Sequence, residues 1–162
     1  IIRYTQLFDL DASLNVFCNR GTSGIDGSTS TAIGASLIHN ERTVFITGDI
    51  SFLYDSNALW NGAIRSDFRI IIVNNDGGGI FKFIPGPKET NALSYFETPH
   101  GLDASHLAKM YGFEYEKAKE LDTLENALER FYQDSEQPKI IEVCTPSHKN
   151  DLILKSYFKS LK

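Results

Sequence analysis

The chain has 162 residues, of which 41% are hydrophobic and 23% charged, as expected for one globular domain with a substantial core. Its formal net charge is -5, and only the short C-terminal helix is rich in Lys, which argues against nucleic acid as a main partner. No apolar run approaches the roughly 18 to 20 residues of a membrane span, and the N-terminus has no basic region followed by an apolar one. We therefore expect a soluble, cytoplasmic protein.

The first half of the chain alternates between expected helices and strands. Residues 1–10 are helix-like, and because the sequence starts inside such a pattern without Met, we expect a fragment of a larger chain. A short strand over residues 14–20 leads into a glycine-rich segment, and residues 28–40 follow as a helix. Strands over residues 42–49 and 68–76, joined by the mostly helical residues 51–65, form a right-handed βαβ unit.

The second half continues the alternation after one interruption. Residues 85–100 contain three prolines and little hydrophobic period, which makes them a candidate lid. A helix over residues 103–112, with Asp103 or Ser105 as its cap and Gly112 as its stop, precedes the remaining elements. These are a strand at 113–119, an amphipathic helix at 123–135, a strand at 138–145 and a helix at 150–162.

This order of elements predicts one α/β domain over residues 1–162, with a largely parallel central sheet and helices on both faces. The continuous apolar run from Ile70 to Val73 is typical of a central strand covered on both sides. In such sheets, ligands bind beyond the carboxyl ends of the strands. That edge is therefore where we expect the functional site.

The cysteines and histidines give no sign of a site. Cys18 and Cys144 lie far apart in strand-like apolar runs without a Cys or His at short spacing, so we expect two buried core residues. The histidines carry no recognisable pattern and receive no role; they are His39, His100, His106 and His148.

Polar residues end two of the expected strands, Gly48-Asp49 in one and Asn74-Asn75 in the next. Neither G-x-G-x-x-G nor G-x-x-x-x-G-K-[ST] occurs, so the dinucleotide and phosphate loops that these patterns mark are not indicated. A carboxylate and an amide oxygen suit Mg²⁺ or Ca²⁺, and Mg²⁺ commonly completes its shell with substrate phosphates. A helix cap at Asp49 and a turn at Asn75-Asp76 would explain the same residues without a metal.

The pair "GDI" and "NN", spanning 28 residues, resembles the GDG-to-NN signature of thiamine-diphosphate-dependent enzymes, with Ile50 in place of the final Gly. In that family the Asp, the last Asn and a main-chain carbonyl two residues further on bind Mg²⁺. The resemblance implies Asp49, Asn75 and Gly77 as the metal ligands.

Three blocks in order narrow the resemblance: "CNRGTSGIDGSTSTAIG", "GDISFLYDSNAL" and "NNDGGGIFKFIP". Together they are similar to the diphosphate-binding domain of the MenD family, the 2-succinyl-5-enolpyruvyl-6-hydroxy-3-cyclohexene-1-carboxylate synthases of menaquinone biosynthesis. The specific motifs lie between Asn19 and Pro85, whereas residues after Pro99 match only in the succession of elements.

This resemblance implies roles for further residues. Ile25 would be the apolar wedge that bends thiamine diphosphate into a V, and the other implied cofactor contacts are Ser23, Gly24, Gly48 and Ser51. The family's substrates, 2-oxoglutarate and isochorismate, are anionic and require arginines. Implied substrate contacts are Arg3, Arg20, Ile80, Phe81 and Ile84. A surface salt bridge is the alternative for each arginine, a helix cap for Ser51, and simple packing for the apolar residues.

The resemblance also implies that part of the active site lies outside this chain. The family's activating glutamate comes from a pyrimidine-binding domain of a second subunit, so we expect a homodimeric or homotetrameric parent enzyme and an inactive isolated chain. Two other interpretations stay open. The chain could be the same domain of another thiamine enzyme, of the acetolactate synthase or 2-oxo-acid decarboxylase type. It could also be a non-catalytic α/β interaction domain, which would show no Mg²⁺-dependent cofactor binding.

Overall fold

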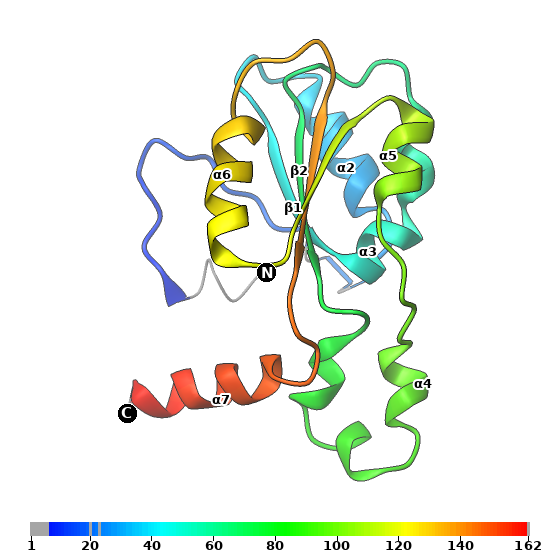
Figure 1. Cartoon of the computed structure of the whole chain (residues 1–162), viewed down its shortest axis with the longest axis vertical. Helices are drawn as coiled ribbons and strands as arrows, with labels where there is room; N and C mark the ends of the chain where they lie inside the picture. The colour runs from blue at the N-terminus through cyan, green and yellow to red at the C-terminus, as the bar shows by residue number, and fades with distance from the viewer. Residues whose placement is uncertain (1–6, 20, 23, 162) are drawn as a thin grey trace.

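A four-stranded parallel sheet, with the order β1-β2-β4-β3, forms the centre of the molecule (Figure 1). The structure is a computed structural model that describes residues 7–19, 21–22 and 24–161, without the side chain of residue 88. The strands are β1 (Val44–Gly48), β2 (Arg69–Asn74), β3 (Glu114–Ala118) and β4 (Lys139–Cys144). The predicted α/β class with a parallel sheet is confirmed.

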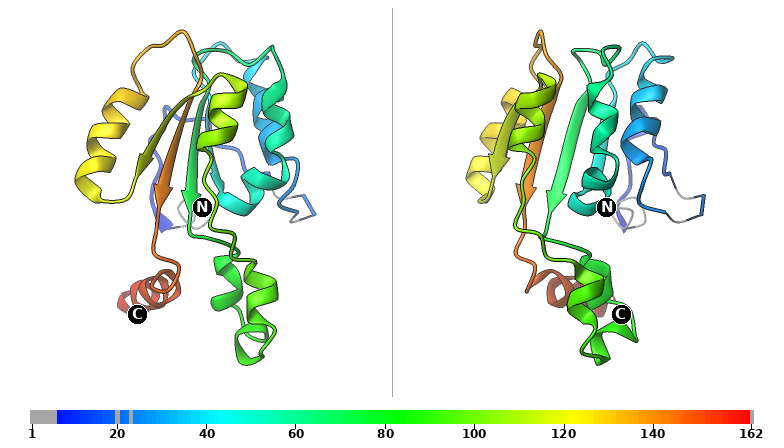
Figure 2. Two further views of the ribbon diagram at one scale, coloured as in Figure 1. Left: turned by 45° about the vertical axis from the view of Figure 1, so that its right-hand side comes forward. Right: turned by 90° about the vertical axis from the view of Figure 1, so that its right-hand side faces the viewer.

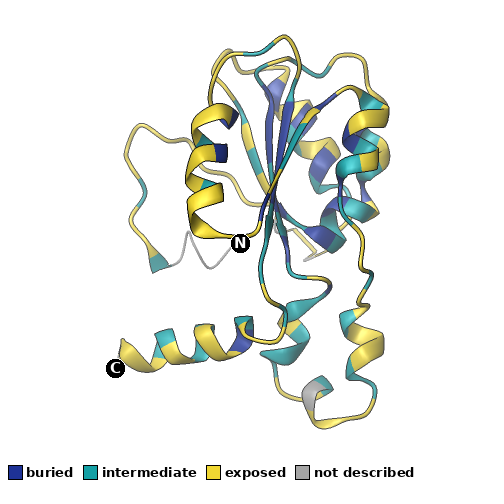
Figure 3. Cartoon of the chain, in the orientation of Figure 1, coloured by how far each residue is buried: buried dark blue, intermediate teal, exposed yellow. Residues whose placement is uncertain are grey.

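Helices cover both faces of this sheet, as predicted (Figures 1 and 2). One face packs against α2 (Ser28–Ser36), α3 (Asp49–Tyr54), η1 (Ser56–Trp60) and α5 (Ser105–Tyr111). The other face packs against α6 (Leu121–Phe131). Successive residues of a strand point to opposite faces, and accordingly Ile70 and Ile72 join the first core whereas Ile71 and Ile141 join the second. Burial is concentrated in the strands and on the sheet-facing sides of the helices (Figure 3).

Beyond the carboxyl ends of the strands, a group of short helices projects from the sheet together with α7 (Asn150–Ser160) (Figures 1 and 2). The group consists of η2 (Gly79–Lys82), η3 (Pro87–Glu89) and α4 (Leu93–Glu97). Lys82 Nζ lies 2.6 Å from Glu97 Oε1, and the rings of Phe81 and Phe96 are 5.3 Å apart. Residues 85–100, predicted to be a loop and a candidate lid, therefore contain short helices, and α4 packs back on Gly77 and Gly78.

The expected strand over residues 14–20 is wrong for the residues that are described, since 14–19 have no regular structure. Phe17 is 82% exposed, and Cys18 is exposed as well, so the predicted burial of Cys18 is also wrong. Apolar residues favour a strand only when neighbours pack against them, and this segment has little packing. Cys144, at the end of β4, is half-buried.

Most other elements are shorter than predicted. The helix expected over residues 51–65 is interrupted at Asp55, whose backbone is not helical. The Asp55 carboxylate accepts hydrogen bonds from Ser30 N at 2.7 Å and Ser30 Oγ at 2.9 Å, and this long-range contact at the start of α2 accounts for the break. The helix expected over residues 28–40 ends at Ser36. In the described part of the expected helix at 1–10, residues 8–10 are not helical. Gly112 ends α5 with φ of 75°, as predicted.

Among the helices of the described residues, none combines the length and the apolar character needed to cross a membrane.

Candidate functional site

The carboxyl ends of β1 and β2 lie next to each other, because Gly48 pairs with Val73 in the parallel register. Asp49 follows β1 directly, and Asn74 and Asn75 stand at the end of β2. The two polar strand ends identified in the sequence therefore meet at one edge of the sheet.

Asp49 is only 4% exposed, and its carboxylate joins the two strand ends. Oδ1 accepts the Ile50 N–H at 2.8 Å, in the first turn of α3, while Oδ2 accepts the Gly77 N–H at 2.9 Å. The helix cap considered for Asp49 is not formed, because Gly48 is the N-cap residue of α3 and no side chain caps that helix end. The contact with Gly77 instead fixes the Asp49 carboxylate against the turn that follows β2.

Asn75 and Gly77 form the other side of this cluster. Asn75 Nδ2 donates to the Gly77 carbonyl at 2.8 Å, and a Cβ added at Gly79 would lie 2.7 Å from the same nitrogen. The turn expected here is also present, since Asp76 has φ of 58° and its N–H donates to Asn74 Oδ1 at 2.9 Å. The three residues implied as metal ligands, Asp49, Asn75 and Gly77, are thus linked through hydrogen bonds.

In donor type this cluster fits Mg²⁺. It offers a carboxylate, an amide oxygen and a main-chain carbonyl, all of them hard oxygen ligands. Ligation by Asn75 would require its amide to turn its oxygen toward the ion, since Nδ2 now faces Gly77 O. In the described part of the chain no group of three or more His, Cys, Asp or Glu side chains could hold a metal, so the structure offers no competing site of that composition.

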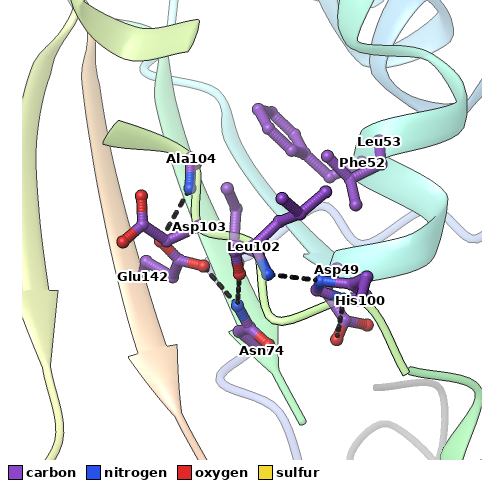
Figure 4. A pocket seen from close by; sticks show the side chains of 10 residues that line it. Asp49, Phe52, Leu53, Asn74, His100, Leu102, Asp103, Ala104 and Glu142 are labelled. Carbon is purple, nitrogen blue, oxygen red and sulfur yellow. Dashed lines mark hydrogen bonds and ion pairs between the residues drawn. The ribbon is translucent and has the colours of Figure 1, made fainter. Parts of the chain in front are cut away.

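A residue to which the sequence assigned no role, His100, lies against Asp49. Its Nε2 is 3.1 Å from Asp49 Oδ2, and both side chains are largely buried (Figure 4). This pair could not be predicted from the sequence, because 51 residues separate Asp49 from His100 and no motif links the two positions. Only the return of the chain after α4 brings His100 back to the strand ends.

A small pocket opens beside this pair. It is lined by Asp49, Asn74, His100 and Glu142 together with apolar side chains that include Phe52 and Ile72 (Figure 4). Its cavity volume of about 10 Å³ has room for about one water molecule. The pocket is therefore part of the support behind the strand ends and is too small for a cofactor.

The glycine-rich loop reaches the start of α3 through one contact. Ser51 Oγ donates to the Ile25 carbonyl, which places the loop that contains Gly24 and Ile25 next to the residues after Gly48. The side chain of Ile25 is exposed rather than part of a core. Three predicted site residues, Arg3, Arg20 and Ser23, lie outside the described residues.

The three apolar residues implied as a substrate wall differ in exposure. Ile80 is 59% exposed, whereas Phe81 and Ile84 are half-buried. Phe81 packs on Phe96, and a Cβ added at Gly78 would lie 3.0 Å from the Phe81 ring. Packing at the base of the 85–100 segment therefore explains Phe81, while Ile80 leaves an apolar surface open to a ligand.

Comparison with known proteins agrees with this geometry. Residues 3–143 match the family described as "Thiamine pyrophosphate enzyme, C-terminal TPP binding domain". The chain belongs to this family. Membership accounts for the position of the polar cluster in this thiamine pyrophosphate domain, at the carboxyl edge of a parallel sheet.

Three curated relatives of this domain share the name 2-succinyl-5-enolpyruvyl-6-hydroxy-3-cyclohexene-1-carboxylate synthase. The protein from Flavobacterium johnsoniae is 59% identical over 161 residues, which is 99% of the chain and 29% of that relative. Those from Christiangramia forsetii and Porphyromonas gingivalis are 53% and 44% identical, over 99% and 97% of the chain and 28% of each relative. The chain thus spans a little under a third of the length of these relatives.

Proposed function

We propose that this chain binds the diphosphate of thiamine diphosphate through Mg²⁺, as one domain of a cytoplasmic, menaquinone-forming synthase. That enzyme would decarboxylate 2-oxoglutarate and add the resulting succinyl unit to isochorismate. The proposal is carried by the identity of 59% over 99% of the chain to a relative named as this synthase. Membership of the thiamine pyrophosphate family and the polar cluster at the strand ends support the cofactor part.

The metal would be held by the Asp49 carboxylate, the Asn75 amide oxygen and the Gly77 carbonyl. These groups are buried or half-buried and come from two adjacent strand ends, where a bound diphosphate would complete the shell of the ion. Gly48 and Ser51 flank the Asp49 carboxylate in sequence, and Ser23 and Gly24 would contact the cofactor from the glycine-rich loop. When bound, thiamine diphosphate supplies the electron sink for decarboxylation of a 2-oxo acid.

Around the cofactor, the residues of this chain would shape the site and bind anions. The exposed Ile25 would support the bent cofactor from below, and Arg3 and Arg20 would bind the carboxylates of the two substrates. Ile80, with Phe81 and Ile84 behind it, would exclude water from the side where the new bond forms.

The remaining group would come from another polypeptide. In our proposal, the glutamate that activates the pyrimidine belongs to a pyrimidine-binding domain of a second subunit, in a homodimer or homotetramer. The chain's coverage of only 29% of its Flavobacterium johnsoniae relative leaves room in that protein for such a domain.

A chimeric enzyme tests the proposed function directly. In the Flavobacterium johnsoniae protein, the matching segment is replaced by this chain, and synthesis from 2-oxoglutarate and isochorismate is measured. We expect activity within about tenfold of the unmodified relative, because 59% identity spans the exchanged segment. Asp49→Ala should abolish it, whereas Asp9→Ala, at an exposed aspartate, should not. A folded chimera without activity would contradict the proposal.

A further inference from the structure

The Asp49 carboxylate is surrounded by donors. Ile50 N–H binds Oδ1, and Gly77 N–H and His100 Nε2 both bind Oδ2. An ionised carboxylate accepts about four hydrogen bonds, two at each oxygen. Within the described residues these three contacts leave one accepting position, on Oδ1. The carboxylate is therefore prevented from rotating and presents a single oxygen for further binding.

The hydrogen-bond partner of the second imidazole nitrogen, Nδ1, shows which nitrogen of His100 carries the proton. His100 Nδ1 accepts the Leu102 N–H at 2.9 Å, so Nδ1 is unprotonated and Nε2 carries the hydrogen that points to Asp49. The backbone that carries His100 is also held in place by Asp76, whose Oδ1 accepts the N–H groups of His100 at 3.0 Å and Gly101 at 2.7 Å.

A buried carboxylate on β4 holds the chain that carries His100. Glu142 is 1% exposed and accepts three hydrogen bonds, from Asn74 Nδ2 at 2.6 Å, Ala104 N at 3.0 Å and the Tyr115 hydroxyl. Asn74 Nδ2 also donates to the Leu102 carbonyl at 3.0 Å. Figure 4 shows the resulting path from Glu142 through Asn74 and Leu102 to His100 and Asp49.

Tyr115 strengthens this anchor as a donor. Burial first, and then its hydrogen bond to the Glu142 carboxylate, raise the pKa of Tyr115 well above its ordinary value. Its hydroxyl thus keeps its proton at any physiological pH. Every donor to Glu142 is therefore permanent, which is the condition under which a buried carboxylate fixes its surroundings rather than destabilising them.

We propose that His100 is a positioning residue for Asp49, and that Glu142 acts through residues 100–104 to keep it in place. The proposal rests on the proposed function in so far as Asp49 is taken as a metal ligand. The imidazole N–H of His100 prevents rotation of the Asp49 carboxylate, so the free accepting position on Oδ1 is already oriented before an ion binds. Groups that orient a metal ligand in this way typically contribute 10- to 100-fold to metal affinity.

The first test uses the cofactor-free chain, first unsubstituted and then with two substitutions at His100. In nitrogen-15 spectra, Nε2 of the His100 ring should carry the hydrogen that points to Asp49, and Nδ1 should be shifted as an acceptor. The Gly77 amide should move in His100→Leu and return toward its original position in His100→Gln, which restores an N–H donor. A ring protonated at Nδ1, or a Gly77 amide indifferent to both substitutions, would overturn the positioning role.

The second test measures binding of thiamine diphosphate with Mg²⁺ in the chimeric enzyme described above. His100→Leu should weaken binding by about 10- to 100-fold, and His100→Gln should recover most of it. His106→Leu, at an exposed histidine of α5, is the matched control and should bind as the unsubstituted protein does. Equal affinity of folded His100→Leu and the unsubstituted protein would refute the proposal.

Glu142 provides an independent check if His100→Leu does not fold. In Glu142→Gln one carboxylate oxygen becomes an amide nitrogen, which cannot accept from Ala104 N or Asn74 Nδ2. We expect weaker Mg²⁺-dependent binding together with a displaced Gly77 amide, and unchanged values of both would overturn the anchor role. If the unsubstituted chimera binds no cofactor, the proposed function fails, while the cofactor-free spectra still decide the positioning of Asp49.

Discussion

Replacement of Gly77 by alanine perturbs the turn on which the candidate site depends. Gly77 has φ of 131°, a backbone conformation open mainly to glycine. An added Cβ would approach Glu97 O to less than 3.0 Å and would lie 3.2 Å from the Glu97 carbonyl carbon. That carbonyl already accepts the Gly78 N–H at 2.7 Å, so it has little freedom to move away.

The expected loss of stability combines three contributions. The unfavourable φ costs about 1–3 kcal/mol. Displacing the Glu97 carbonyl weakens its hydrogen bond to Gly78, which adds about 1 kcal/mol, and the close approach itself adds a further amount of that order. We therefore expect Gly77→Ala to lower the free energy of unfolding by about 3–5 kcal/mol, which at a slope of about 2 kcal/mol per molar moves the urea midpoint down by roughly 2 M.

Gly86→Ala is the matched control for this prediction. Gly86 also has positive φ, at 103°, but nothing lies within 4 Å of an added Cβ, so alanine there meets only the conformational cost. Urea unfolding of both variants, with equal slopes, should place Gly77→Ala at least about 1 kcal/mol below Gly86→Ala. Equal losses of unfolding free energy in the two variants would show that the close approach of residue 77 to Glu97 costs no stability, and would refute the reasoning.

Three further predictions follow from other parts of the molecule. Arg69 is fully buried and donates to the Phe131 and Gln133 carbonyls, so Arg69→Met should lower Tm by roughly 6–12 °C, about 3 kcal/mol, and an unchanged melting curve would contradict this. Hydrogen bonds from Lys117 first, and then from Ser105, lower the pKa of Asp103, so its contribution to stability is present above the unfolded pKa of about 3.9 and is lost as pH falls below it. Asp103→Asn should therefore flatten the decline of stability between about pH 4 and pH 2 in urea titrations, and an unaltered acid profile would exclude this role. The isolated chain should form no product from 2-oxoglutarate and isochorismate, and any turnover by it would show that the second domain is not required.

The fold was largely predictable because its signals are local. The apolar run Ile70–Val73 and the alternation of strands with amphipathic helices are sufficient to indicate a parallel sheet with helices on both faces. Where the prediction was wrong, long-range contacts decided the outcome. Asp55 interrupts a helix because its carboxylate binds Ser30, and residues 14–19 remain irregular because little packs against Phe17.

The candidate site was predictable only in part. Asp49 and Asn75 stand out because polar residues at two strand ends must meet at one edge of a parallel sheet. His100 and Glu142 gave no such signal, since their importance lies in contacts across 51 residues to Asp49 and 68 residues to Asn74. Roles of supporting residues depend on the packed structure and therefore become visible only there.

The most direct test of the central claim is a calorimetric titration of this chain with thiamine diphosphate, with Mg²⁺ and with a chelator in its place. The cofactor should bind only when Mg²⁺ is present, and Asp49→Ala should lose that binding while Asp9→Ala keeps it. No Mg²⁺-dependent binding even at millimolar cofactor, or equal binding by Asp49→Ala, would contradict the account.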